Sequence, residues 1–364
     1  MSRKKLIGVI VIIIVIAGAV IFKQNSQTSV NEVKLGLMLP LTGDYGAAGQ
    51  NMQKGMELAI EQYQKNNPGV TLQVAIEDDA YNSAKGVSAY KKLVDLDKVD
   101  TILMLSTPVI DTIHEDVVKK GIPVIQLGIQ TVGIADDNII QFSPASEAPI
   151  GSLATYLSTN ENFANEKVAV IYDNSPAQIS FFETFDKVYQ HEFTTMIVND
   201  KSDLRNYATK IANENYDAVV VIESPENGAL FTKELITVDT TLPSLAYDAQ
   251  LQTGFGDYEK ILGDTNKING AKSIWFKEGN TAEFKKLFNE KYGEDPGFLA
   301  DFAYDMVNTA LETYESNDSD WVKNLKKFSN SDGVSGSISF DENGVRIQPM
   351  TITEIKGRKL VPTE

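Results

Sequence analysis

Short β-branched runs alternate with segments of helical period along most of this chain, and this alternation limits the fold more than any other feature. From residue 33 onward, the pattern predicts strands at 34–39, 70–77, 100–105, 123–127, 167–172, 194–198, 217–222 and 244–247. Segments with one apolar helical face fill the gaps between these strands. The pattern is typical of parallel sheets with helices on both faces, so we predict an α/β fold.

The chain divides into two such series, which are separated near residues 143–149. A length of 364 residues, 42% of them hydrophobic, is enough for two domains. We therefore expect two α/β lobes, each with its own sheet. In such sheets a ligand crevice lies at the carboxyl ends of the strands.

Two β-like stretches close the chain. They cover residues 336–340 and 345–355, and they follow helical patterns at 281–291 and 299–314. The residues Asp341 to Gly344 between the two stretches are typical of a hairpin turn.

The charge balance and the cysteine count exclude several classes of function. Acidic side chains outnumber basic ones by 50 to 33, which repels phosphate backbones, so no nucleic-acid partner is predicted. The chain contains no cysteine, which removes disulfides, thiol nucleophiles and thiolate metal sites. It also removes the residue that carries the lipid of a bacterial lipoprotein.

The N-terminus has the layout of an export signal. Basic residues at positions 3–5 precede an apolar run at 6–22 and a polar stretch at 23–31. Since basic flanks stay in the cytoplasm, the rest of the chain is expected outside it. The small residues Ala17 to Ala19 would suit cleavage, which would give a periplasmic protein. The apolar run continues through Val20 to Phe22, which favours an uncleaved single-pass anchor in the cell membrane.

Catalytic patterns are missing from the sequence. The two histidines, His114 and His191, lie outside any metalloprotease motif, and neither a nucleophile elbow nor a phosphate-binding loop is present. The adjacent acid pairs at 78–79 and 136–137 show no matched acid and base, and are typical of solvated caps. We predict a protein that is not an enzyme and has neither a cofactor nor a catalytic or metal site.

Several motifs resemble one known family. The segments Leu39 to Gly43, Gly49-Gln50 and Gly55 to Ile60 are similar to the opening strand, loop and first helix of the branched-chain amino-acid (Leu/Ile/Val)-binding protein family. That family has the type I periplasmic binding fold and serves ABC transporters as substrate-binding proteins. Further similar pieces lie at residues 77–79, 121–124, 216–220, 303–305 and 336–344.

The resemblance implies two Rossmann-like lobes joined by a three-strand hinge. Lobe 1 would contain residues 33–148 and 276–333, lobe 2 residues 149–275 and 334–364, and residues 1–32 would form the anchor or signal segment and a linker. The implied function is to capture a small polar ligand, an amino acid or a related compound, and to deliver it to the permease subunits of an ABC importer. A membrane-tethered ligand-sensing receptor subunit of the same fold is the alternative, because fold alone does not fix function.

The implied ligand contacts in lobe 1 lie in two loops. Ser106 and Thr107 end a strand and open a helix, where hydroxyl and amide groups could bind a carboxylate, and the family's carboxylate-binding serine aligns near Ser106. The alternative is that these residues only cap the helix. The second binding loop of the family matches Gly128 to Thr131, so Gly128, Gln130 and Thr131 are candidate contacts.

The remaining candidates come from other loops. By resemblance, Asp248 would pair with a ligand ammonium group, and its alternative role is that of a loop or cap aspartate. Ser175 lies in the lobe 2 loop 173–177, where Ala177 stands near the family's ligand-stacking tyrosine, and Ser224 stands near another aromatic contact of the family. The resemblance therefore implies a wider or more polar pocket. Tyr45 and Tyr81 could supply aromatic walls from lobe 1, or could be hinge or surface residues.

Overall fold

The computed structural model of the chain describes residues 31–43, 45–128, 138–165, 167–238, 241–314 and 321–363. The N-terminal segment that predicts a membrane anchor or signal lies outside these residues. Across the described ranges, no helix is both long and apolar enough to cross a membrane. The chain forms two units, residues 1–125 with 297–321 and residues 126–296 with 322–364. The lobe boundaries implied by the resemblance remain a prediction.

One sheet has five strands in the order β2-β1-β3-β4-β5. Their bounds are Asn31–Leu39 for β1, Val70–Asp78 for β2, Thr101–Met104 for β3, Val124–Gln126 for β4 and Ile139–Gln141 for β5. The interior strand β1 pairs in parallel with β2 and β3. Leu35, Leu37 and Met38 of β1 are all fully buried, so both faces of this strand are covered, as expected of an interior strand of a parallel sheet.

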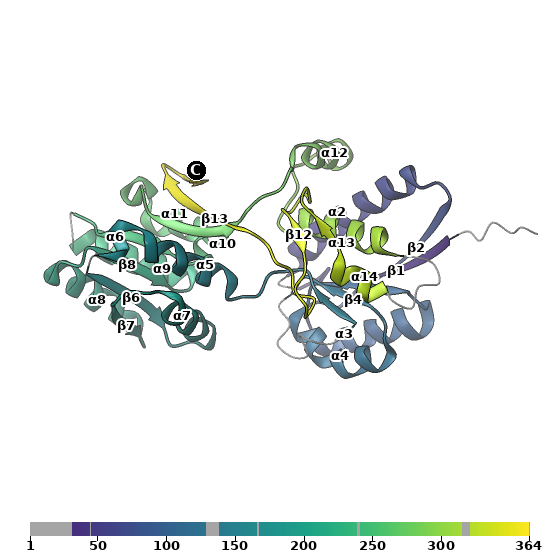
Figure 1. Cartoon of the computed structure of the whole chain (residues 1–364), viewed down its shortest axis with the longest axis horizontal. Helices are drawn as coiled ribbons and strands as arrows, with labels where there is room; N and C mark the ends of the chain where they lie inside the picture. Colours follow the sequence, from purple (N-terminus) through teal and green to yellow (C-terminus); the bar gives the residue numbers. More distant parts are fainter. Residues whose placement is uncertain are drawn as a thin grey trace, which may run out of the picture. The chain divides into compact units, whose positions relative to one another are not determined.

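The helices of the first unit cover both faces of this sheet (Figure 1). They are α2 (Gly46–Asn66), α3 (Ser83–Lys91) with the π-helical turn η1 (Lys92–Asp97), α4 (Thr107–Lys120) and α13 (Ala300–Thr313). In Figure 1, α2 and α13 lie together on one side, and α3 and α4 on the other. The contact between α2 and α13 is close at Gly55, where an added Cβ atom would lie 2.1 Å from the carbonyl oxygen of Ala300.

The second sheet has seven strands in the order β14-β13-β10-β9-β8-β6-β7. Their bounds are Val168–Asp173 for β6, Thr194–Val198 for β7, Ala218–Ile222 for β8, Ser244–Tyr247 for β9, Lys272–Phe276 for β10, Met350–Lys356 for β13 and Lys359–Pro362 for β14. Strands β6 to β10 are parallel, whereas β13 runs antiparallel to β10 and to β14. The carboxyl ends of the parallel strands therefore share one edge of the sheet.

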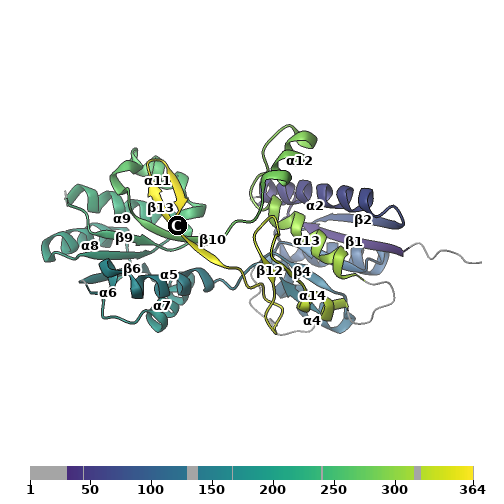
Figure 2. The same cartoon turned by 45° about the horizontal axis from the view of Figure 1, so that its top comes forward.

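Helices lie on both sides of the seven-stranded sheet (Figure 2). On one side are α5 (Ala148–Thr159), α6 (Glu161–Ala164) and α7 (Pro176–Val188). On the other are α8 (Lys201–Glu214), α9 (Pro225–Val238), α10 (Gln250–Thr253), α11 (Phe255–Leu262) and the 3-10 turn η2 (Thr265–Ile268). A separate apolar core fills each side, because alternate residues of the buried strands point to opposite faces.

The C-terminal segment differs from the predicted hairpin. After α12 (Ala282–Tyr292), α14 (Trp321–Lys327) and the short strands β11 (Ser329–Asn330) and β12 (Ile338–Ser339), the chain turns at residues 341–344. Phe340 and Arg346 form a bridge across this turn. The prediction of one strand over 345–355 is wrong, because the strand begins only at Met350 and joins the seven-stranded sheet. Pro349, which has no N–H to donate, immediately precedes it.

Candidate functional site

Three carboxyl groups lie at the carboxyl-end edge of the seven-stranded sheet. Asp173 is the last residue of β6, Glu223 follows β8 directly, and Asp248 follows β9 directly. Strands β9, β8 and β6 are neighbours in the sheet. The charge of Asp173 raises the pKa values of both other acids, which places the three carboxyl groups within electrostatic reach of one another.

Asp248 is buried, with 4% of its surface exposed. Its carboxylate accepts hydrogen bonds from the backbone N–H of Gln250 at 3.0 Å and from the Gln250 side-chain amide at 3.4 Å. Burial nevertheless raises the pKa of Asp248 to about 8, because desolvation penalises the charged form more than these bonds favour it. A cation placed beside this group would reverse that balance and stabilise the carboxylate.

Glu223 is buried even more completely, with 2% of its surface exposed. Among the described residues, neither of its carboxyl oxygens has a partner with normal hydrogen-bond geometry. The side chains of Asn227 and Asp173 are close enough to influence it, but burial is the main reason that the pKa of Glu223 is raised to about 8. A buried acid with a strongly raised pKa is typical of functional sites, because folding alone gives no compensation for it.

An apolar pocket of about 210 Å³ lies beside Asp248, within the second unit. Its walls come from the start of α5, from α7, from the loop after β9 and from the end of β10. The lining residues are Ser146, Pro149, Ile150, Phe181, Asp248, Ala249, Gln250, Trp275 and Phe276. The rings of Trp275 and Phe276 are in contact, with centroids 4.8 Å apart. The pocket therefore combines aromatic walls with one buried carboxyl group.

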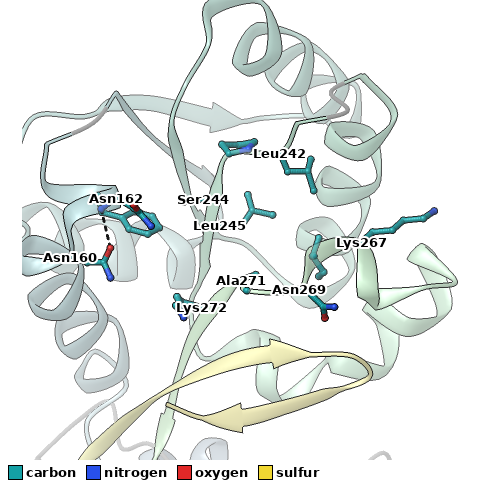
Figure 3. Close-up of a pocket in the computed structure, with 13 residues that line it drawn as sticks. Asn160, Asn162, Leu242, Ser244, Leu245, Lys267, Asn269, Ala271 and Lys272 are labelled. Atoms are coloured by element: carbon teal, nitrogen blue, oxygen red, sulfur yellow. Dashed lines mark hydrogen bonds between the residues drawn. The ribbon is translucent and has the colours of Figure 1, made fainter. Parts of the chain in front are cut away.

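A second, more polar pocket of about 290 Å³ lies at the opposite strand ends (Figure 3). Ser244 and Lys272, which line it, are the first residues of β9 and β10. Lys272 is paired with Glu354 at 2.7 Å, and the side chain of Asn160 accepts a hydrogen bond from the backbone of Asn162. Among the described residues, no carboxyl group lines this pocket. The carboxyl-end edge is therefore the better candidate in this unit.

The first unit has its own polar group at the carboxyl end of β3. The side chain of Ser106 is fully buried, and its hydroxyl donates a hydrogen bond to the Asp79 carboxylate at 2.8 Å. It makes no capping bond to α4, so the cap interpretation is wrong for this side chain. Desolvation raises the pKa of Asp79, although the bonds from Ser106 and from the Tyr81 backbone oppose that shift.

Tyr45 and Tyr81 stack against each other in the first unit. Their ring centroids are 4.0 Å apart, with 23° between the ring planes. Tyr45 is 49% exposed, whereas Tyr81 is half-buried and lies close enough to Thr107 for that residue to influence the pKa of its phenol. Ala80 and Tyr81 have φ angles of 48° and 54°, a region that costs strain for residues other than glycine. The structure thus brings both predicted tyrosines and Thr107 together in one strained loop cluster.

The other predicted contacts that the structure describes, Gly128, Ser175 and Ser224, belong to the second unit. Gly128 is half-buried, and Gln130 and Thr131 lie outside the described residues. Ser175 and Ser224 are half-buried. The Ser175 backbone N–H donates to the Asp173 carboxylate at 2.8 Å, and Ser224 directly follows Glu223. The ligand roles of all these residues stay predictions. The sequence reasoning missed Asp173 and Glu223, although each ends or directly follows a buried apolar strand, as Asp248 does.

Residues 32–359 match the periplasmic binding protein family. The chain belongs to this family. This periplasmic binding protein is 23% identical over 249 residues to a Leu/Ile/Val-binding protein of Rhizobium johnstonii. The match covers 62% of this chain and 63% of that protein. The chain spans about three fifths of the length of the curated relatives it matches, 63% and 58% in two of them.

Solved structures show the fold of this periplasmic binding protein. It is similar to a branched-chain amino acid transporter substrate-binding protein from Streptococcus pneumoniae, in complex with isoleucine, with a TM-score of 0.67 and 20% identity over 92% of this chain and all of the other. It is also similar to a solute-binding protein from R. palustris, in complex with benzoate, with a TM-score of 0.62 and 18% identity over 91% of this chain and 95% of the other.

These matches confirm the resemblance to branched-chain amino-acid-binding proteins and the two-lobed α/β fold that it implies. The family is one of solute-binding proteins rather than of enzymes, and an extracytoplasmic location fits it.

Proposed function

We propose that this chain captures a small solute that carries an ammonium group, an amino acid or a related compound, outside the cytoplasm. We further propose that it delivers this solute to the permease subunits of an ABC importer, and that its N-terminal segment tethers it to the membrane. The buried carboxyl group of Asp248 at the end of β9 is the observation that carries the choice of solute.

The electrostatics of the second unit favour a cationic group on the ligand. Asp248 and Glu223 are both buried, and both have pKa values of about 8, so in the free protein each is mostly protonated at pH 7. An ammonium group beside them would gain a charge-assisted hydrogen bond, which is strong where water is excluded. An anionic ligand group would instead have to lie away from these acids.

The first unit contains polar groups of its own that suit an anionic group. Thr107 opens helix α4, whose N-terminal backbone amides carry a positive partial charge that favours a carboxylate. The hydroxyl of Ser106 already donates to Asp79, so Thr107 and the helix amides, rather than the Ser106 side chain, are the candidate anion contacts of this unit. Tyr45 exposes 49% of its surface beside them in the same unit.

A thermal-shift screen tests the proposal. The full chain, kept in mild detergent because of its apolar N-terminal run, is heated with amino acids, short peptides, amides, sugars and nucleosides. A ligand that binds only the folded state raises the melting temperature. We expect shifts with amino acids or other amines. Shifts only with sugars or nucleosides would contradict the choice of solute and leave the binding function in place.

The role of Asp248 is tested by titration of the best ligand into the Asp248→Asn variant. Loss of the charge-assisted bond is expected to weaken binding by roughly 1.5 to 3 kcal/mol, about ten- to a hundredfold in Kd. Asp257→Asn is the matched control, because Asp257 is an exposed aspartate of helix α11 in the same unit. Equal affinities for both variants and the wild type would remove Asp248 from the site.

A further inference from the structure

The apolar pocket beside Asp248 has a composition that selects for a particular ligand shape. Three of its walls are aromatic: Phe181 from α7, and Trp275 and Phe276 from the end of β10. Pro149 and Ile150 line it from the start of α5. Its volume of about 210 Å³ exceeds the roughly 150 Å³ of an apolar cavity that is known to bind benzene. A ring-sized apolar group therefore fits.

The polar groups at this pocket are few, and they define the charge of its occupant. Asp248 is the one ionisable side chain among the described residues that line it. Glu223, buried and without a hydrogen-bond partner of normal geometry among the described residues, lies within electrostatic reach of Asp248. A cation in the pocket would stabilise the charged forms of both acids, whereas an anion could be held only while both acids stay protonated.

We propose that this pocket holds the ring of an aromatic amine, so that the protein selects aromatic amino acids and arylalkylamines over small amines and over aromatic acids. The proposal rests on the proposed function and deepens it, since the ammonium group of the same solute would pair with Asp248. Burial of the ligand's ring against Phe181 and Trp275 provides the affinity, and the Asp248 carboxyl group favours a ligand with a positive charge.

The first test compares four probes by isothermal titration of the full chain in mild detergent. Phenylalanine and phenylethylamine carry a ring and an ammonium group, alanine carries the ammonium group alone, and benzoate carries a ring and a negative charge. We expect both ring-bearing amines to bind roughly tenfold or more tightly than alanine, because a buried ring contributes far more apolar area than a methyl group. Benzoate is expected to bind at least as weakly as alanine.

Variants then assign this preference to the pocket. Phe181→Ala removes one wall and is expected to lower the preference for phenylalanine over alanine by about tenfold. Phe182→Ala is the matched control, because this neighbouring half-buried residue of α7 stacks on Tyr172 at 4.1 Å and does not line the pocket. Ala249→Phe fills the cavity from a different element, and it should exclude phenylalanine while alanine still binds.

The outcomes separate this inference from the proposed function. Equal binding of alanine and phenylalanine, tight binding of benzoate, or a preference that survives both Phe181→Ala and Ala249→Phe would overturn the assignment of the pocket, while amine binding itself would stand. Failure of all three amines to bind the wild-type chain would overturn the proposed function together with this inference.

Discussion

The buried carboxyl group of Glu223 predicts that the protein loses stability as the pH rises. In the unfolded chain this group has its ordinary pKa of 4.5, and in the folded protein burial raises the pKa to about 8. Between these two values the folded state binds more protons than the unfolded state, so the free energy of unfolding falls with increasing pH. The full difference corresponds to roughly 4 to 5 kcal/mol, of which about 3 kcal/mol is already lost at pH 7.

The assay is chemical denaturation at pH 5, 6, 7 and 8, followed by the intrinsic fluorescence of the two tryptophans, of which Trp275 lies in the same unit as Glu223. Glu223→Gln keeps the shape of the side chain and removes its titration, so this variant is expected to be more stable than the wild type at pH 8 and to show a shallower pH dependence. Some pH dependence of the stability should remain in this variant, because Asp248 titrates in the same range and the charge of Asp173 acts on both acids.

The control is Glu226→Gln, which changes an exposed glutamate paired with Lys201 on the surface. Surface pairs contribute little, so its stability should follow the wild type across the pH range. If Glu223→Gln and the wild type lose stability in parallel between pH 5 and 8, the reasoning about this buried acid is wrong.

Three further predictions follow from close contacts and from the buried acids. Gly55→Ala should destabilise the first unit by roughly 1 to 3 kcal/mol in thermal or chemical denaturation, because the new Cβ would lie 2.1 Å from the Ala300 carbonyl oxygen, whereas Gly69→Ala, with open space around it, should be nearly neutral. Ser106→Ala should cost about 1 to 3 kcal/mol of stability, since it removes the hydroxyl donor to the buried Asp79. Binding of an amine at pH 7 should release protons from the buried acids of the second unit, which titrations in buffers of different ionisation enthalpy would detect; zero proton release would contradict the pairing.

Much of the fold follows from hydrophobic patterning. The predicted strands of the two sheets agree with the structure within one residue at each end, except that β1 begins three residues before the predicted start and β13 five residues after it, because burial on both faces leaves a continuous signal in the sequence. The strands β5, β10, β11 and β14 were missed. Strands β5 and β14 are short, with three and four residues, and the central position of β10 depends on β13, which comes more than 70 residues later in the chain. Pairing of that kind is a tertiary property that local patterns do not carry.

The candidate site was predicted in part. Asp248 was identified through a family resemblance, and the structure shows it buried at a strand end. Glu223 and Asp173 follow the same pattern and could have been found from it. The apolar pocket could not, because its aromatic walls come from Phe181 and Trp275, which are about ninety residues apart and meet only when helix α7 packs on the sheet.

A crystal structure of the chain with the amine that binds most tightly in the screen tests the central claim most directly. We predict that the ammonium nitrogen lies within a charge-assisted hydrogen-bond distance, about 2.7 to 2.9 Å, of the Asp248 carboxylate. An amine bound away from Asp248, for example in the polar pocket at the opposite strand ends (Figure 3), would contradict the account.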